Sequence, residues 1–127
     1  MLRTPPGTRW SNAIFLAREL GSRRLVTAVL PGDFGKPRRV VIVQASAFAE
    51  HHASITVCPL TTRLTGLRLF RIMVAPDTRN GLDEPSEIMV DKLNSLRRER
   101  IGSSIGRLSP FDLRAVDDAL RRWLAPG

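Results

Sequence analysis

The run RVVIVQ, residues 39–44, is the sequence feature that most constrains the fold. Its four successive apolar residues are all β-branched, which favours a strand with both faces buried. A second apolar run, ITVCPL at residues 55–60, follows closely along the chain. The two runs predict neighbouring central strands in one small core.

The remaining segments predict several shorter strands and one clear helix. We expect strands at residues 25–30, 67–75, 86–90 and 101–108, an extended segment at 91–96, and an Asn80-Gly81 hairpin turn. Ser109 and Pro110 have the residue types that begin a helix. Apolar residues recur after them at helical spacing and predict a core-facing stripe: Leu113, Val116, Leu120, Trp123 and Leu124. The pattern indicates a mainly β, α+β fold: a small barrel or strongly bent sheet with a C-terminal helix.

A chain of 127 residues is expected to form one main domain. We assign that domain to residues 25–127 and treat residues 1–24 as an N-terminal extension, either partly helical after Ser11 or disordered. No apolar run is long enough to span a membrane, and the opening residues do not resemble a signal peptide. A single cysteine, Cys58, forms no internal disulfide, so we expect a cytoplasmic protein.

The net charge of +8 favours a polyanionic partner. Residues 1–24 contribute half of it, with five arginines and one glutamate. Nearly all the positive charge is arginine, because Lys36 and Lys92 are the only lysines. Arginine binds phosphate through two parallel hydrogen bonds, which favours nucleic acid as the polyanionic partner. The alternative is that the high arginine content reflects the base composition of the genome.

Several kinds of catalytic site are missing from the sequence. No glycine-rich phosphate loop precedes a helix, and there is neither a Cys/His cluster nor an H-E-x-x-H motif for zinc. The carboxylates are scattered, which argues against a two-metal nuclease. We therefore expect no metal and no cofactor.

Three other groups of residues could have a functional role, but each also has a structural explanation. His51 and His52 have the chemistry of general acids and bases, but adjacent side chains diverge, so exposed positions at a helix end are favoured. Cys58 lies inside a buried run and is expected to be inert packing. Asp91 and Lys92 either pair with each other or contact a ligand.

A cationic loop precedes the strand at residues 39–44, and a polar segment follows the strand at 55–60. If these strands are antiparallel neighbours, Arg38 and Thr61 meet at one edge of the sheet. A guanidinium and a hydroxyl placed there can bind a phosphate and stabilise charge that develops on it.

Four segments together resemble the MazF/PemK family of toxin–antitoxin ribonucleases: LPGDFGKPRRVVIVQ, TVCPLTT, PSEIMVDKL and IGSSIGRLSPFDLRAVDDALRRWL. Their order and spacing, over roughly residues 25–124, make the resemblance specific. It implies an SH3-like barrel of the CcdB/PemK type, a homodimer, and metal-independent cleavage of single-stranded RNA through its 2′-hydroxyl. It also implies a cognate antitoxin of the MazE/PemI type that covers the RNA groove.

The resemblance assigns the catalytic roles to Arg38 and Thr61. Arg38 would stabilise the phosphorane and Thr61 would orient the phosphate, while the general base stays open between Asp33, a histidine, and proton transfer through Arg38. Nine further residues are expected to bind RNA: Asp33, Gly35, Lys36, Arg39, Thr62, Arg63, Ser86, Asp91 and Lys92.

Two positions depart from the family pattern. Arg39 stands where the family usually has proline, and Ser22-Arg23-Arg24 replaces an Arg-Gly-Asp-like step before the first strand. Two other functions remain open on the same fold: a CcdB-like gyrase poison, and a non-catalytic module that binds antitoxin or RNA.

Overall fold

The computed structural model describes residues 24–44 and 53–125. The elements follow the chain in this order: β1 (Arg24–Val29), β2 (Pro37–Ile42), β3 (Ser54–Thr61), β4 (Arg71–Val74), β5 (Ser86–Met89), the 3-10 turn η2 (Val90–Lys92), β6 (Asn94–Arg97), the 3-10 turn η3 (Arg98–Arg100), β7 (Ile101–Arg107) and helix α3 (Pro110–Leu124). None of the helices in the described part is long and apolar enough to cross a membrane.

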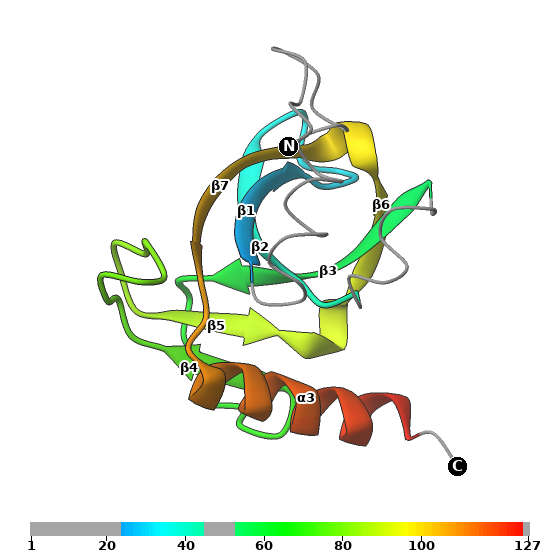
Figure 1. Cartoon of the computed structure of the whole chain (residues 1–127). Helices are drawn as coiled ribbons and strands as arrows, with labels where there is room; N and C mark the ends of the chain where they lie inside the picture. Colours follow the sequence, from blue (N-terminus) through cyan, green and yellow to red (C-terminus); the bar gives the residue numbers. More distant parts are fainter. Residues whose placement is uncertain (1–23, 45–52, 126–127) are drawn as a thin grey trace, which may run out of the picture.

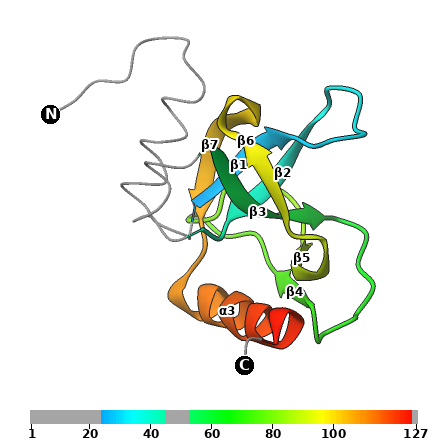
Figure 2. The same ribbon diagram turned by 90° about the vertical axis from the view of Figure 1, so that its right-hand side faces the viewer.

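The strands form one strongly bent antiparallel sheet in the order β4-β5-β3-β2-β1-β7, and β6 also pairs with β3. Figures 1 and 2 show the sheet curling round on itself, with α3 lying across its β4 and β5 end. β3 is central because its first half pairs with β6 and its last residues pair with β5. The predicted α+β fold with a C-terminal helix is confirmed.

Both faces of the central strands are buried, which explains their continuous apolar sequence. Val40 and Ile42 pack in one core cluster with residues of β1, β3, β6 and β7. Val41 points to the opposite face, as the strand alternation requires, and packs in a second cluster with residues of β5 and α3. The sheet is therefore held from both sides near the residues where β2 begins and β3 ends.

Helix α3 begins as the sequence predicts. The Ser109 hydroxyl accepts a hydrogen bond from the backbone N–H of Asp112 at 3.1 Å, and Pro110 occupies the first turn. Val116 and Ala119 are buried against the sheet, whereas Trp123 and Leu124 are 43% and 58% exposed. The predicted core stripe is therefore wrong at its C-terminal end, where Trp123 instead packs edge-on against Phe70.

Two strand predictions are longer than the strands observed. The expected strand at residues 67–75 shortens to β4, because a turn closed by the Arg71 N–H and the Leu67 carbonyl oxygen at 3.1 Å precedes it. The extended segment expected at 91–96 is interrupted by η2, and only then does β6 begin. In both places a turn stabilised by a backbone hydrogen bond forms where the sequence pattern predicts an extended strand.

The Asn80-Gly81 pair does not form a two-residue hairpin turn. β4 and β5 pair as a hairpin, but a long loop at residues 75–85 joins them, and Asn80 is buried inside that loop. The Asn80 side chain accepts hydrogen bonds from the Asp77 and Leu82 N–H groups and donates one to the Ala75 carbonyl. Residues 45–52, which include His51 and His52, and residues 1–23 of the predicted N-terminal extension lie outside the described residues.

Candidate nucleic-acid interface

A cavity of about 370 Å³ lies where β2 begins and β3 ends. The antiparallel pairing of Val40 with Pro59 and of Val41 with Cys58 brings these two strand ends to the same edge. Arg38 and Thr61 therefore line one cavity, although they are distant in sequence. Its lining residues are Thr27, Lys36, Pro37, Arg38, Arg39, Leu60, Thr61, Thr62 and Ser86.

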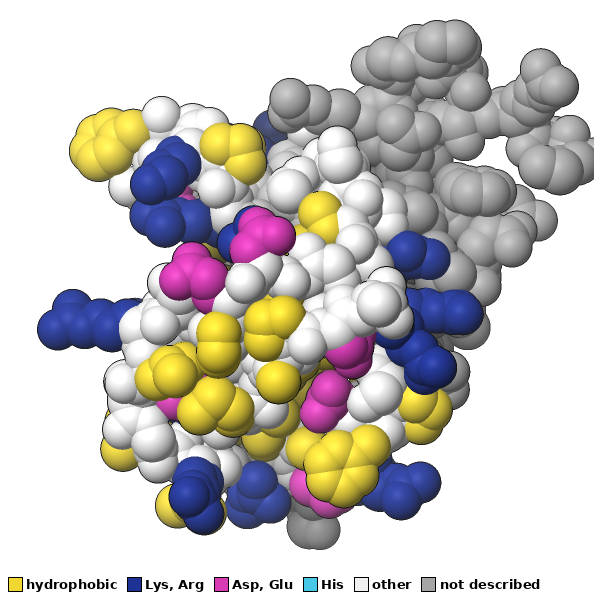
Figure 3. Space-filling model, turned by 90° about the vertical axis from the view of Figure 1, so that its left-hand side faces the viewer, with side chains coloured by type: hydrophobic (Ala, Val, Ile, Leu, Met, Phe, Trp, Pro, Cys, Tyr) yellow, Lys and Arg dark blue, Asp and Glu magenta, His cyan; other side chains and the backbone are white. Residues whose placement is uncertain are grey.

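The loop between β1 and β2 contributes Lys36 to the cavity lining. It folds through two backbone hydrogen bonds, from Asp33 N–H to the Leu30 carbonyl and from Lys36 N–H to the Asp33 carbonyl. Phe34 and Gly35 both have positive φ, and the Phe34 side chain is fully exposed. Figure 3 shows this loop as a projecting lobe with hydrophobic and basic side chains, separated from the body by a hollow.

Arg38 is held by a carboxylate of that loop. Its Nε donates to Asp33 Oδ2 at 3.1 Å, and its Nη2 donates to Asp33 Oδ1 at 3.5 Å. The Arg38 side chain is 45% exposed, so it remains within reach of a ligand in the cavity. This contact between the loop and β2 orients the guanidinium.

Arg39 is held by a carboxylate of a different loop. Its Nη2 lies 2.9 Å from Asp83 Oδ2, and Asp83 belongs to the loop between β4 and β5. The sequence offered no signal for this pair, because the two residues are 44 positions apart.

Thr61 ends β3 with its hydroxyl at the cavity. Its Oγ1 accepts a hydrogen bond from the Arg63 N–H at 3.1 Å, which turns the chain away from the strand. Thr62 lines the cavity beside it, whereas Arg63 is exposed outside the lining. Across the sheet, Thr61 pairs with Glu87 of β5.

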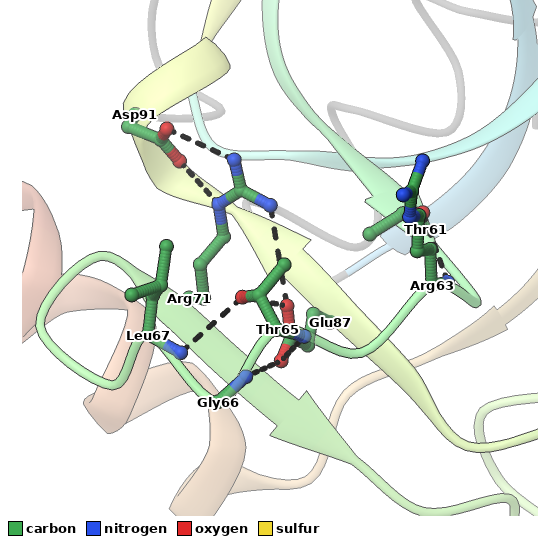
Figure 4. A network of polar contacts seen from close by, with 8 residues as sticks. All are labelled: Thr61, Arg63, Thr65, Gly66, Leu67, Arg71, Glu87 and Asp91. Carbon is green, nitrogen blue, oxygen red and sulfur yellow. Dashed lines mark hydrogen bonds and ion pairs between the residues drawn. The ribbon is translucent and has the colours of Figure 1, made fainter.

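Glu87 is a buried carboxylate that sequence reasoning missed. It accepts hydrogen bonds from the Thr65 N–H, the Thr65 hydroxyl and the Gly66 N–H, each at 2.9 Å (Figure 4). Burial alone would raise the pKa of Glu87, but these hydrogen bonds and the nearby Arg71 hold it below its ordinary value. A lone glutamate inside the apolar stretch SEIMV was the available signal.

Arg71 joins Glu87 to Asp91 in the same network. Its Nε and Nη2 donate to the two Asp91 oxygens at 2.7 and 3.1 Å, and its Nη1 lies 4.0 Å from Glu87. The hydrogen bonds from Arg71 lower the pKa of Asp91. Asp91 therefore pairs with Arg71 rather than with Lys92, which is exposed.

The sequence-predicted RNA-binding residues fall into three groups. The cavity lining contains Lys36, Arg39, Thr62 and Ser86. Asp33 and Gly35 belong to the β1–β2 loop. Arg63, Asp91 and Lys92 are not part of the lining, and Asp91 is engaged in the Arg71 pair.

The remaining candidates do not converge on the cavity. His51 and His52 lie outside the described residues. Cys58 is buried, and desolvation raises its pKa to about 12, so its thiolate is not available at neutral pH. Residues 24–44 and 53–125 contain no group of three or more His, Cys, Asp or Glu residues placed to hold a metal ion.

Comparison with known proteins gives consistent results. The chain is 38% identical over 101 residues to a probable endoribonuclease MazF of Mycolicibacterium smegmatis, covering 79% of this chain and 92% of the relative. It is 31% identical over 85 residues to endoribonuclease MazF3 of Mycobacterium tuberculosis, covering 67% and 80%.

Solved structures extend the likeness to three dimensions. The Mycobacterium tuberculosis toxin MazF-mt6 aligns with a TM-score of 0.71 at 27% identity, over 83% of this chain and 99% of that one. A mycobacterial endoribonuclease in complex with its cognate antitoxin has the same fold, with a TM-score of 0.67 at 19% identity, over 82% and 93%. Residues 24–124 match the family model of the PemK-like, MazF-like toxins of type II toxin–antitoxin systems, and the chain belongs to that family.

Proposed function

We propose that this chain is an endoribonuclease that cuts single-stranded RNA, including mRNA, in the cavity between β2 and β3. As the toxin of a type II toxin–antitoxin pair, it would thereby inhibit translation and growth. The observation that carries the proposal is the placement of Arg38 and Thr61 in one cavity, with Lys36 on its wall. Three polar groups of this kind suit a phosphodiester, which is a diffuse anion with several acceptor oxygens.

The proposed reaction is the one that the family resemblance implies, and Arg38 and Thr61 have the chemistry to assist it. The RNA 2′-hydroxyl attacks the adjacent phosphorus, a five-coordinate phosphorane forms, and the bond to the 5′-oxygen breaks. The 2′-hydroxyl proton passes to a base, and the leaving 5′-oxygen takes up a proton. The products are a 2′,3′-cyclic phosphate and a free 5′-hydroxyl, with no metal required by the scheme.

Arg38 is suited to stabilise the phosphorane. Its charge persists at any physiological pH, and its planar fork matches two phosphate oxygens. It is a poor base in the same pH range. The Thr61 hydroxyl can donate to a further phosphate oxygen and fix the orientation of the phosphate. Asp33, which already contacts Arg38, is one candidate for the base, alongside a histidine or proton transfer through Arg38 itself.

The remaining predicted contacts extend from this centre. The β1–β2 loop, with Asp33, Gly35 and Lys36, would close over the RNA strand. The polar residues of the cavity lining would hold the phosphates on either side of the scissile one: Arg39, Thr62 and Ser86. Three residues outside the lining would contact the rest of the RNA strand: Arg63, Asp91 and Lys92. Bases splayed from a single strand then supply the sequence preference.

The partners we propose are a second copy of this chain and a cognate antitoxin. Two structural relatives are complexes of a toxin with its antitoxin, one mycobacterial and one from Deinococcus radiodurans. An antitoxin segment that competes with RNA at a basic cavity is expected to be acidic or aromatic. The setting is the cytoplasm, where mRNA is present. Light scattering should give a dimer at micromolar protein, and simultaneous binding of antitoxin and RNA would contradict a shared site.

A CcdB-like gyrase poison is the alternative from another functional class. The relatives are named endoribonucleases, which does not favour it. Neither Arg38 nor Thr61 would be needed for that activity.

The test is cleavage of a long RNA by the purified protein in EDTA. The wild-type protein should cut it, and Arg38→Ala should cut at least about a hundredfold more slowly, the typical loss when one transition-state donor is removed. Arg114→Ala on α3 is the matched control and should cut normally, since this arginine is exposed and outside the cavity. An uncut RNA, or inhibition of gyrase supercoiling instead, would refute the proposal.

A further inference from the structure

Each of the two consecutive arginines at the cavity is paired with its own carboxylate. Asp33 of the β1–β2 loop holds Arg38, and Asp83 of the β4–β5 loop holds Arg39. Figure 3 shows acidic side chains at the rim of the hollow, beside the basic ones. We propose that Asp83 occupies the place that an RNA backbone phosphate takes on Arg39, which makes Arg39 a second phosphate subsite and Asp83 its internal competitor.

The two arginines cannot easily share one phosphate. Consecutive residues of a strand point to opposite sides, and their partners show it: Arg38 reaches the β1–β2 loop while Arg39 reaches the β4–β5 loop. Both residues still contribute to the lining of the same cavity. An RNA strand that places one phosphate at Arg38 therefore presents a neighbouring phosphate to Arg39. This step rests on the proposed function only in taking Arg38 as the centre of cleavage.

A carboxylate is a suitable stand-in for that phosphate. Guanidinium groups bind carboxylate and phosphate oxygens with the same geometry, so the two anions compete for one position. The contact between Arg39 Nη2 and Asp83 is direct, at 2.9 Å, and Asp83 is 79% exposed. Such an exposed pair contributes little to folding, and water can take up the carboxylate once it is displaced.

The position of Asp83 is fixed by the fold of its loop. Buried Leu82 precedes it and packs in the second core cluster. Asn80 holds the turn by its three hydrogen bonds, and Gly81 lies so close to Ile105 that a Cβ would fall 2.0 Å from the Ile105 carbonyl oxygen. The chain thus delivers this carboxylate to Arg39 from an anchored turn rather than from a freely moving tip.

The consequence is a restraint on binding. Three cations line the cavity: Lys36, Arg38 and Arg39. The carboxylates of Asp33 and Asp83, which pair with the two arginines, offset most of this positive charge. A polyanion gains the full attraction only if its phosphates displace both carboxylates. Asp83 therefore weakens binding of any strand whose backbone does not reach Arg39.

The test measures binding without cleavage. The probe is a short fluorescent single-stranded DNA of mixed sequence, which carries backbone phosphates but no 2′-hydroxyl. Anisotropy titrations at about 50 to 200 mM salt give the Kd and its salt dependence. Asp83→Asn is compared with Glu84→Gln, which makes the same change in net charge one residue away.

Asp83→Asn should bind about threefold or more tightly than Glu84→Gln, as expected when a neighbouring competitor is removed. Its plot of log Kd against log salt should be steeper by up to about 0.7, the value for one single-strand phosphate. In an Arg39→Gln background the difference between the two variants should vanish. Melting curves should show that all the variants are folded.

Three results would overturn the proposal. Equal effects of Asp83→Asn and Glu84→Gln on the Kd would mean that only long-range charge affects binding. Weaker binding by Asp83→Asn would mean that the Arg39–Asp83 pair supports the structure of the site. An effect of Asp83→Asn that persists in the Arg39→Gln background would mean that Asp83 does not compete at Arg39. Undetectable DNA binding by all the variants would remove the phosphate subsite. RNA cleavage by the wild-type protein is scored separately, so either proposal can fail while the other stands.

Discussion

Thr61 shows how a single hydroxyl is placed at the cavity. Its backbone ends β3 opposite Glu87, and its Oγ1 is the acceptor for the Arg63 N–H. The antiparallel pairing of two buried apolar strands predicted that this residue would share an edge with Arg38. The pairs made by Asp33 and Asp83 were not predicted, because an ion pair between a loop carboxylate and a strand arginine leaves no periodic pattern in a sequence.

Thr61→Val should abolish most RNA cleavage while leaving the fold intact. Valine is nearly isosteric and suits a strand, so the change removes the hydroxyl and little else. We expect a rate lower by about tenfold to a hundredfold, in the range for loss of one oriented donor. The matched control is Thr56→Val, on the same strand but with its hydroxyl near Ser95. Full activity of Thr61→Val would show that the hydroxyl has no role.

At the scale of elements, the loop between β3 and β4 is held by a buried polar network. Glu87 on β5 accepts hydrogen bonds from Thr65 and Gly66. Arg71 on β4 lies between Glu87 and Asp91 of η2 and contacts both carboxylates. Strand existence and the start of α3 were predictable from apolar runs and a capping serine. The network was not, because a lone glutamate in the stretch SEIMV does not indicate which distant loop groups it binds. The shortening of β4 was not predictable either, because it depends on a backbone hydrogen bond.

Glu87→Gln should destabilise the protein by about 2 kcal/mol, because a carboxylate that accepts several hydrogen bonds is replaced by a neutral amide. A loss of that size lowers Tm by roughly 10 °C in a small domain. Glu84→Gln, in an exposed position, should leave Tm unchanged. Thermal unfolding followed by circular dichroism measures both variants.

The same carboxylate predicts an acid sensitivity with a defined sign. The folded-state pKa of Glu87 lies below the ordinary value of 4.5, so its contribution to stability is present above that pH and is lost as the pH falls through 4.5 and lower. Tm of the wild-type protein should therefore fall more steeply on acidification than Tm of Glu87→Gln. Parallel curves for the two proteins would show that Glu87 does not carry this dependence.

At the scale of the whole molecule, we propose that residues 25–127 form the toxin domain and that residues 1–24 are an extension. The family match begins at residue 24, and Arg38 and Thr61 both lie beyond it. The extension carries half of the net charge, so its contribution to RNA binding should be electrostatic.

A chain that begins at Ser22 should fold and cut RNA at nearly the full-length rate. Its RNA binding should weaken at low salt, because fewer arginines release fewer counterions. Cleavage assays at several salt concentrations, with melting curves, measure both effects. If the shortened chain is insoluble, inactive or melts several degrees lower, the extension belongs to the folded domain.

Cleavage by the RNA's own 2′-hydroxyl is the central claim, and one substrate pair tests it most directly. An RNA oligonucleotide that the protein cuts in EDTA is synthesised again with a single 2′-deoxynucleotide on the 5′ side of the cut. We predict that the all-RNA strand gives a 2′,3′-cyclic phosphate and a 5′-hydroxyl by mass spectrometry, and that the substituted strand stays whole at that position. Cutting of the substituted strand at the same bond would show that the 2′-hydroxyl is not the nucleophile.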